Sequence, residues 1–497
     1  MNAAAAIPVR DPGDVNRGFA MLIDGAWIPA ASGQTFACVD PYSEESWGRV
    51  PKADTADVDR AVRAARAAFD ARGWPQTPPA RRAALLRRLA QLIEENGELL
   101  ALRQIRENGK LIGEMRGGSA VLAAACHYFA GLAETESGKT VPISYPNVVG
   151  YTVREPIGVV AAITPWNSPL LLLGWKLFAA LAAGNTVVVK PSEITPTSTL
   201  LLADLIVRAG FPPGVVNIVT GLGDTGRALV EHPLIDKIAF TGSTATGRAI
   251  AHVAAERNAR VSLELGGKSP NIIFADADLS NAVNGVMAGI FAATGQSCMA
   301  GSRVLVEASA YEEVASLLVS RARLMRPGDP LDPKTQLGPL ASRGQLEKVL
   351  SYFEIAREDG LELLTGGRRI DRRGFFVEPT VYGNVSNQCR VAREEIFGPV
   401  VVLMRFRDEE EAVAIANDTI YGLAAGVWTE NVRRAHRMVS RLRAGTVWVN
   451  NYRLVTYAAP FGGFKQSGLG RELGPEALDD YTELKSVWID TVERSDL

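Results

Sequence analysis

The chain of 497 residues is too long for one ordinary hydrophobic core, so two or three domains are expected. Its contents of 47% hydrophobic and 22% charged residues are typical of a soluble globular protein, and a net charge of -2 argues against a nucleic-acid-binding surface. Four cysteines are too few for a disulfide framework, which favours a cytoplasmic location. The scattered histidines show no ligand spacing, so no metal site is predicted.

The first part of the chain is predicted to be mostly helical. Residues 1–8 lack the basic start and sustained apolar core of a signal peptide, and we expect a loose tail there. Apolar residues at helical spacing predict helices over 56–71, 78–103 and 115–134. Residues 138–156 then alternate like a β-hairpin with a turn at Pro146-Asn147.

From residue 157 the pattern becomes an alternation of strands and helices, which is typical of a doubly wound α/β sheet. Predicted strands at 158–163, 186–190, 215–219, 237–240 and 261–264 are separated by helices beginning near 169, 197, 225 and 244. The apolar run 157–184 is long enough to cross a bilayer. Three residues, Pro165, Asn167 and Pro169, interrupt that run, so we expect a strand, a loop and a buried helix, and no membrane partner.

The alternation restarts near residue 271 and predicts a second α/β domain. It includes strands at 271–274, 303–307 and 445–450 and helices at 280–293, 311–325, 342–359, 409–417 and 430–442. Residues 484–490 form an isolated late strand, and an exposed strand of this kind needs a partner, which suggests a subunit contact. The fold class predicted is therefore α/β, with two doubly wound domains and a small β element.

Two glycine-rich segments carry a nucleophile and a carboxylate. Cys298 ends Gly295-Gln296-Ser297-Cys298, and Glu264 opens Glu264-Leu265-Gly266-Gly267-Lys268 about thirty residues upstream. A thiolate can attack a carbonyl carbon, and a nearby carboxylate can then activate water. The remaining cysteines are interpreted as small buried hydrophobic residues: Cys38, Cys126 and Cys389.

Two further segments fit a dinucleotide. Lys190 and Glu193 follow a strand, where a carboxylate can accept hydrogen bonds from ribose hydroxyls, although the two could also form a surface ion pair. The pattern Gly221–Gly226 follows the wrong strand to work with Glu193. Phe240-Thr241-Gly242-Ser243 leads into a helix whose free N–H groups suit a pyrophosphate, and an ordinary serine-capped helix is the alternative.

These motifs, in this order, resemble the aldehyde dehydrogenase superfamily from about residue 20 to about residue 490. Further matching segments are Ile163-Thr164-Pro165-Trp166-Asn167, Glu394-Glu395-Ile396-Phe397-Gly398-Pro399 and 460–468. The resemblance implies an NAD-binding domain, a catalytic domain and an oligomerisation element that builds a homodimer or homotetramer. The NAD-binding domain is expected over 1–137 and 157–264, and the catalytic domain over 265–465. The oligomerisation element is expected over 138–156 and 466–497.

The resemblance also implies that the chain oxidises an aldehyde to a carboxylic acid. Cys298 would form a thiohemiacetal with the aldehyde, and Asn167 and the Cys298 backbone N–H would hold the oxyanion. Hydride transfer to nicotinamide would leave a thioester. Glu264 would then activate the water that hydrolyses it. Lys176 would orient the groups around Asn167 and Glu264, and Glu472 would relay a proton from Glu264. The cofactor-binding positions implied are Ile163, Thr164, Pro165, Trp166, Lys190, Ser192, Glu193, Gly223, Phe240, Thr241, Gly242, Ser243, Leu265, Glu395 and Phe397. Glu193 should repel a 2′-phosphate, which favours NAD, with NADP possible.

The substrate pocket implied by the resemblance contains Ser168, Leu172, Trp175, Ala292, Ser297, Arg453, Val455 and Phe461. Ser168, Ala292 and Val455 replace bulky aromatic residues of many relatives, which argues against an aromatic cage for a quaternary ammonium. Arg453 can clamp a carboxylate, which suggests a polar or semialdehyde-like substrate, or it can pair with a protein acid or a neighbouring subunit.

Three other functions are weighed against this one. A CoA-acylating relative would generally lack the carboxylate at Glu264. A non-catalytic NAD-binding protein would not need Cys298, Glu264 and Asn167 together. A cysteine peptidase would need a histidine partner in a recognisable motif, and none is seen.

Overall fold

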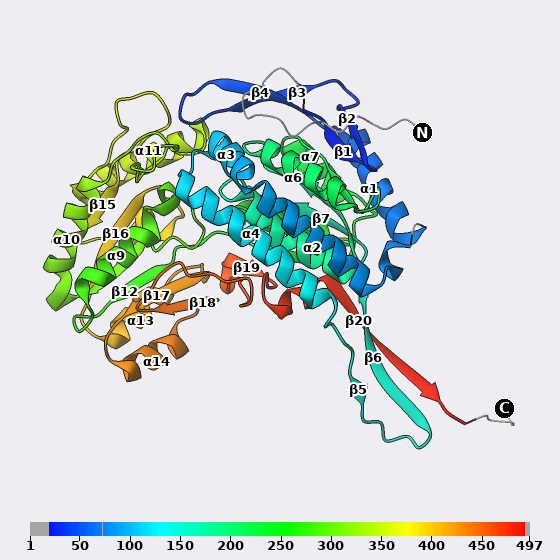
Figure 1. The fold of residues 1–497 in the computed structure, drawn as a ribbon. Helices are drawn as coiled ribbons and strands as arrows, with labels where there is room; N and C mark the ends of the chain where they lie inside the picture. The colour runs from blue at the N-terminus through cyan, green and yellow to red at the C-terminus, as the bar shows by residue number, and fades with distance from the viewer. Residues whose placement is uncertain (1–18, 72, 493–497) are drawn as a thin grey trace.

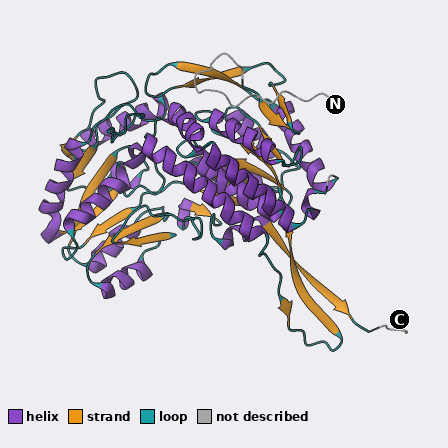
Figure 2. Ribbon diagram, viewed as in Figure 1, coloured by secondary structure: helices purple, strands orange, loops and turns teal. Residues whose placement is uncertain are grey.

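A computed structural model of the chain describes residues 19–71 and 73–492. The tail predicted over residues 1–8 lies outside these ranges. Figure 1 shows two α/β lobes and a slender β arm that extends from one of them. Helices cover the sheets of both lobes (Figure 2). The predicted fold class, with two α/β domains and a small β element, is confirmed.

The first lobe is built on an eight-stranded sheet of order β19-β11-β10-β7-β8-β9-β1-β2. Its five central strands run parallel and are almost wholly buried, which is why their sequences are continuous apolar runs. They are β7 (Val159–Ile163), β8 (Thr186–Lys190), β9 (Val216–Ile218), β10 (Lys237–Thr241) and β11 (Arg260–Glu264). Antiparallel edge strands complete the sheet: β1 (Met21–Ile23), β2 (Ala26–Ile28) and β19 (Gly468–Leu469).

The helices of this lobe follow the predicted alternation. They are α1 (Thr55–Asp70), α4 (Ile112–Ala133), α5 (Pro169–Ala183), α6 (Pro196–Ala209), α7 (Gly223–Glu231) and α8 (Thr244–Ala255). The single helix predicted over 78–103 is instead two helices, α2 (Pro79–Glu95) and α3 (Gly97–Asn108). The helix breaks at Asn96, whose φ of -111° and ψ of 14° are not helical and whose side-chain amide donates to the Leu92 carbonyl at 2.7 Å.

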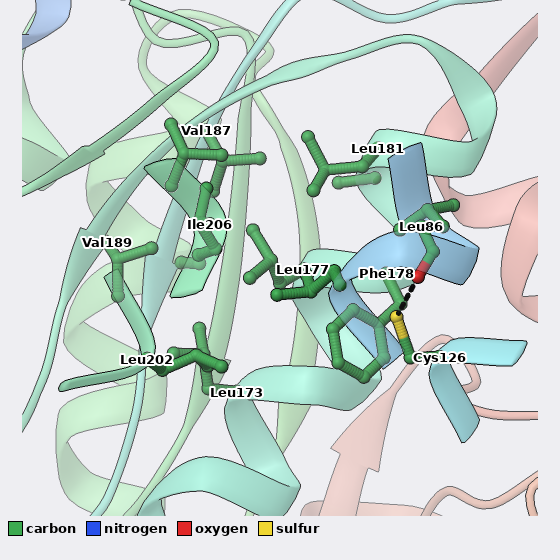
Figure 3. Packing of buried hydrophobic residues seen from close by; sticks show 14 of the residues in the cluster. Leu86, Cys126, Leu173, Leu177, Phe178, Leu181, Val187, Val189, Leu202 and Ile206 are labelled. Carbon is green, nitrogen blue, oxygen red and sulfur yellow. Dashed lines mark hydrogen bonds between the residues drawn. The ribbon is translucent and has the colours of Figure 1, made fainter. Parts of the chain in front are cut away.

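The core beneath α2, α4 and α5 is apolar and closely packed (Figure 3). Leu177 and Phe178 of α5 lie beside Cys126 of α4, whose thiol donates to the Leu86 carbonyl at 3.2 Å. The interpretation of Cys126 as a buried small residue is therefore correct. The apolar run 157–184 is divided between β7 and α5, and no helix in the described ranges is long and apolar enough to cross a membrane.

The second lobe contains a seven-stranded sheet of order β14-β15-β16-β13-β12-β17-β18. Its strands are β12 (Pro270–Ile273), β13 (Arg303–Glu307), β14 (Glu362–Thr365), β15 (Thr380–Gly383), β16 (Val400–Phe406), β17 (Ala424–Trp428) and β18 (Thr446–Val449). Its helices are α9 (Leu279–Ile290), α10 (Tyr311–Leu324), α11 (Arg343–Glu358), α12 (Arg390–Arg393), α13 (Glu409–Asn417) and α14 (Val432–Arg441). The helix predicted to reach residue 293 stops at Ile290, before a kinked turn in which Ala293 and Thr294 both have φ of 54°.

The β arm is a three-stranded sheet of order β20-β6-β5. Residues of β20 (Thr482–Asp490) pair antiparallel along the whole of β6 (Val148–Pro156), and β5 (Thr140–Val141) pairs on the other side. The predicted hairpin is therefore present, with Asn147 in the left-handed region at its turn. The late C-terminal strand is not isolated, as the sequence suggested, because β6 of the same chain is its partner.

The C-terminal part of the predicted oligomerisation element, residues 466–497, has two different surroundings in the structure. Of residues 466–497, β19 pairs with β11 in the first sheet, and the turn η5 (Pro475–Tyr481) buries Ala477, Leu478 and Tyr481 in the core of that lobe. Burial in that core removes these apolar side chains from water, which stabilises the turn against the lobe. In the described C-terminal residues, the arm begins at Thr482. A separate hairpin, β3 (Thr35–Val39) and β4 (Ser46–Pro51), lies outside both large sheets.

Candidate active site

A cavity of about 250 Å³ lies between residues of the two lobes. Cys298 and Asn167 line it together with seven of the eight predicted substrate positions: Ser168, Leu172, Trp175, Ser297, Arg453, Val455 and Phe461. The eighth, Ala292, is not in the lining, and Ala293 takes its place. The kink at Ala293 explains the difference, because a positive φ there turns the chain away from the helical direction that the sequence predicted.

Cys298 is half-buried and faces this cavity. Burial raises the pKa of its thiol to about 12, and the negative charges of Glu264 and Glu395 act in the same direction. The backbone N–H groups of Met299 and of Cys298 itself oppose the rise, because they donate toward the sulfur and favour the anion. The thiol is therefore protonated at neutral pH in this state, and it needs a nearby positive charge to become a nucleophile.

Asn167 is buried at the cavity wall with its amide held in place. Its side-chain nitrogen donates to the Gln296 carbonyl at 3.1 Å, which orients the amide and leaves its second N–H for another acceptor. The Gln296 side chain accepts from the Ala341 N–H at 2.9 Å and donates to the Ala293 carbonyl at 3.3 Å. Such a preorganised donor beside a thiol suits a developing oxyanion.

Glu264 ends β11 and is only 4% exposed. Neither of its carboxylate oxygens has a hydrogen-bond partner within the described part of the chain. Burial raises its pKa well above the ordinary value, and the negative charge of Glu472 raises it further. A carboxylate whose pKa is raised takes up a proton more readily than an ordinary one, as a general base must.

Lys176 is predicted to orient the groups around Asn167 and Glu264, and in the described residues its side-chain hydrogen bonds go to Thr241 and Glu472. The Lys176 ammonium donates in both bonds, and all three side chains are buried. Burial raises the pKa of Glu472, and the contact with Lys176 opposes that rise. The positive charge of Lys176 lowers the pKa of Glu264, whereas the negative charge of Glu472 raises it, so both groups lie near Glu264.

The predicted ribose anchors lie at the carboxyl end of β8. Lys190 and Glu193 form an ion pair at 3.8 Å, and the Lys190 ammonium also donates to the Pro191 carbonyl at 3.1 Å. Ser192 lies next to Glu193, with its hydroxyl at 3.4 Å from that carboxylate. The geometry leaves both interpretations of the pair open, because an ion pair this long can also exchange for hydrogen bonds to a ligand.

The β10–α8 turn contains the predicted phosphate-binding segment. Ser243 caps α8, since its hydroxyl accepts from the Thr246 N–H at 3.2 Å. Gly242 is close to Phe240, and a Cβ atom at this glycine would lie 2.4 Å from the aromatic ring. The serine-capped helix that was weighed as an alternative is therefore present, and its N-terminus also remains suitable for an anion.

Several residues predicted to bind the nicotinamide end are held by specific contacts. Glu395 is positioned by the Gly267 N–H, which donates to its carboxylate at 3.1 Å, and the rings of Trp166 and Phe397 meet edge to face at 5.3 Å. The Leu265 N–H donates to the Ser467 carbonyl at 2.9 Å. These contacts bring residues from both lobes to one region.

Two details of the predicted cofactor residues fit a dinucleotide. The buried Thr164 hydroxyl, just after β7, has no hydrogen-bond partner in the described ranges. A Cβ atom at Gly223, at the start of α7, would meet nothing within 4 Å, so that backbone is open to a neighbouring ligand. Ile163 and Pro165 flank Thr164 at the same strand end.

The sequence analysis missed two charged residues of the cavity, Lys110 and Glu114. Lys110 is 8% exposed, and its ammonium donates to the Ser168 hydroxyl at 2.8 Å. Glu114 accepts from the backbone N–H groups of Ala293 and Leu111 at 2.6 and 3.3 Å. Both lie in or just before α4, far in sequence from Cys298, and the segment Asn108-Gly109-Lys110 was the only local sign of a turn there.

A cysteine facing a cavity beside a fixed amide donor, together with a buried carboxylate, defines a thiol-dependent enzyme built on a dinucleotide-type fold. The model of the aldehyde dehydrogenase family matches residues 27–487. The chain belongs to the aldehyde dehydrogenase family, which confirms the predicted family and the enzyme class, an oxidoreductase acting on aldehydes.

Similar proteins cover almost the whole chain. An aldehyde dehydrogenase of Emericella nidulans is 45% identical over 94% of both chains, and the rat aldehyde dehydrogenase called cytosolic 1 is 46% identical over 94% of both. Among solved structures, the NAD+ complex of an aldehyde dehydrogenase from Bacillus cereus has a TM-score of 0.94 and 47% identity, covering 96% of this chain and 97% of that one. Betaine aldehyde dehydrogenase from Staphylococcus aureus, also in complex with NAD+, has a TM-score of 0.94 and 39% identity, covering 96% and 95%.

Proposed function

We propose that this protein oxidises a small polar or carboxylate-bearing aldehyde to the carboxylic acid with NAD as the oxidant. The observation that carries the proposal is that the Cys298 thiol and the Asn167 amide line one cavity, while the buried Glu264 carboxylate has no hydrogen-bond partner within the described residues. The direct test is NADH formation when the purified protein is supplied with aliphatic, aromatic and semialdehyde substrates.

The residues support a two-stage covalent mechanism. The Cys298 thiol loses its proton to water in the cavity, and the thiolate sulfur bonds to the carbonyl carbon. The resulting oxyanion accepts hydrogen bonds from the Asn167 amide and the Cys298 N–H. When bound, oxidised nicotinamide supplies the acceptor for the hydride that leaves this carbon with its electron pair. Glu264 then takes a proton from water as the water oxygen attacks the thioester, and the carbon–sulfur bond breaks to release the acid.

The contacts above allow specific residues to hold the cofactor. Lys190 and Glu193 would bind the adenine ribose, the N-terminus of α8 at Ser243 would bind the pyrophosphate, and Glu395 with Phe397 would bind the nicotinamide end. The Bacillus and Staphylococcus neighbours are NAD+ complexes, which supports NAD as the cofactor.

We expect NAD to be preferred over NADP by at least about tenfold in kcat/KM, because the Glu193 carboxylate would face the extra phosphate of NADP. Replacing Glu193 by glutamine should narrow this preference and leave kcat with NAD nearly unchanged. The measurement is kcat/KM for both cofactors at a saturating aldehyde concentration. A wild-type protein that prefers NADP would contradict the assignment of Glu193.

The substrate proposal rests on Arg453. Its guanidinium donates to the Ala288 carbonyl at 3.1 Å, and no ion pair in the described part of the chain involves it. Within those residues Arg453 therefore has no acidic partner, so its guanidinium is available to a substrate carboxylate or to a neighbouring subunit. A cationic lining would also disfavour a quaternary ammonium substrate.

Replacing Arg453 by alanine should raise KM for carboxylate-bearing aldehydes by roughly 10- to 100-fold, since a hydrogen bond to a charged group contributes about 1.5–3 kcal/mol. KM for an uncharged aldehyde of equal length should change little. The exposed Arg433→Ala variant is the matched control for loss of one positive charge. Unchanged KM for carboxylate-bearing aldehydes would refute the role of Arg453.

Two alternatives have different products. A CoA-acylating enzyme would form acyl-CoA when CoA is added, and the Glu264 carboxylate argues for hydrolysis instead. A non-catalytic NAD-binding protein would form no NADH with any aldehyde. Either result would replace the proposed function.

We further propose that the chain acts as a cytoplasmic homodimer or homotetramer. The β arm exposes large apolar side chains that a partner subunit would cover, namely Leu484, Trp488 and Ile489 of β20 and Val149 of β6. The cytoplasmic location agrees with the low cysteine content and with the cytosolic rat relative.

A further inference from the structure

Lys110 is held in the cavity by the way α3 ends. The helix stops at Asn108, and Gly109 takes a left-handed φ of +71°, where a Cβ atom would lie 2.5 Å from the Pro339 side chain. The Lys110 N–H donates to the Asn108 side chain at 3.0 Å, and the same side chain donates to the Trp166 carbonyl at 3.3 Å. The turn thus joins Lys110 to the loop that carries Asn167 and directs the Lys110 side chain toward the cavity.

The ammonium group of Lys110 has donors to spare. The residue is only 8% exposed, and in the described ranges the hydrogen-bond partner of its ammonium group is the Ser168 hydroxyl at 2.8 Å. A lysine ammonium has three N–H donors, and leaving a buried donor without a partner is unfavourable. Lys110 and Ser168 both line the cavity that contains Cys298, so the free donors have space for a ligand.

The charges of the cavity lining do not balance. Its cations are Lys110 and Arg453, and its acid is Glu114. Both carboxylate oxygens of Glu114 already accept backbone hydrogen bonds, and the Arg453 charge lies near enough to Lys110 to lower the pKa of that amine. Burial is the largest cause of the fall of this pKa to about 8, while attraction to Glu114 opposes it. A buried surplus of positive charge of this kind is relieved by an anionic ligand.

We infer that Lys110 is a substrate-binding residue that binds the carboxylate of a short aldehyde together with Arg453. The inference rests on the proposed function and restricts its range of substrates. Two cations in the cavity of the reactive thiol select for a substrate that carries its own negative charge. Lys110 and Cys298 line the same cavity of about 250 Å³, so the aldehyde and carboxylate groups should be separated by only a few carbon atoms.

Two substrates of equal chain length test the inference: 4-oxobutanoate, which carries a carboxylate, and butanal, which does not. The Lys110→Met variant keeps most of the side-chain length but loses the charge. We expect its kcat/KM for 4-oxobutanoate to fall by roughly 10- to 100-fold and its kcat/KM for butanal to change less than about threefold. Lys110→Arg, which keeps the charge, should retain most of the preference for 4-oxobutanoate. Equal losses with both substrates would overturn the inference.

Binding measurements separate this inference from the proposed chemistry. In the Cys298→Ala background, calorimetry should give a weaker Kd for 4-oxobutanoate when Lys110→Met is added, with no change in the Kd of NAD. A similar Kd with and without the Lys110 substitution would refute the role of Lys110. A protein that binds 4-oxobutanoate through Lys110 but never forms NADH would instead refute the proposed oxidation alone.

Discussion

Replacing Glu264 by glutamine should give one rapid burst of NADH followed by a nearly complete stop. The amide keeps the shape of the side chain but cannot take a proton from water, so the thioester on Cys298 should form and then persist. Loss of a general base lowers a rate by about 10²- to 10⁴-fold, and we expect steady-state turnover to fall within that range. Stopped-flow absorbance at the NADH band measures both phases, and mass spectrometry should find the acyl group on Cys298.

The exposed Glu476→Gln variant is the control for loss of one carboxylate near the C-terminal turn. It should show no burst-and-stall behaviour. If the Glu264→Gln variant turned over at the wild-type rate in the steady state, Glu264 could not be the base.

The environment of Glu264 also gives a sign for the pH dependence. Burial and the charge of Glu472 raise the pKa of Glu264 well above the ordinary value, so the carboxylate that acts as base becomes populated only as the pH rises through this higher pKa. Hydrolysis of the thioester by the wild-type protein should therefore become faster with increasing pH across that region. The Glu264→Gln variant should lose this dependence.

The Cys298→Ala variant should abolish aldehyde oxidation, with a loss on the order of 10⁴-fold or more, because no other group can form the covalent adduct. NAD binding should persist, since Cys298 is absent from the contacts that link Lys190, Glu193 and Ser243 to their neighbours. Turnover is measured by NADH formation, and NAD binding by calorimetry.

Cys389→Ala is the matched control for this variant. Cys389 is also half-buried and unpaired, but it precedes α12 and does not line the cavity. The Cys389→Ala variant should retain wild-type turnover. Appreciable aldehyde oxidation by Cys298→Ala would mean that the covalent mechanism is wrong.

The main strands and helices could be predicted because each depends on neighbouring residues. Apolar runs in the sequence predict the five buried parallel strands. The helices between them end at residues such as Gly184 and Gly210, which both have positive φ. The motif residues around Cys298 and Glu264 were recognisable for the same reason, since each motif is a short continuous segment. The break at Asn96 escaped prediction because the apolar spacing on either side of it is compatible with one helix.

The amino-acid sequence by itself therefore determined the α/β class and the family resemblance, and it singled out Cys298 and Glu264 as the proposed nucleophile and base. Only the tertiary structure decided which groups surround them. Lys176 contacts Glu472 across 296 positions, Lys110 meets Ser168 across 58, and β20 finds its partner in β6 at the other end of the chain. Local sequence patterns do not predict such pairings, because the free energy that selects them comes from burying side chains that are distant in sequence.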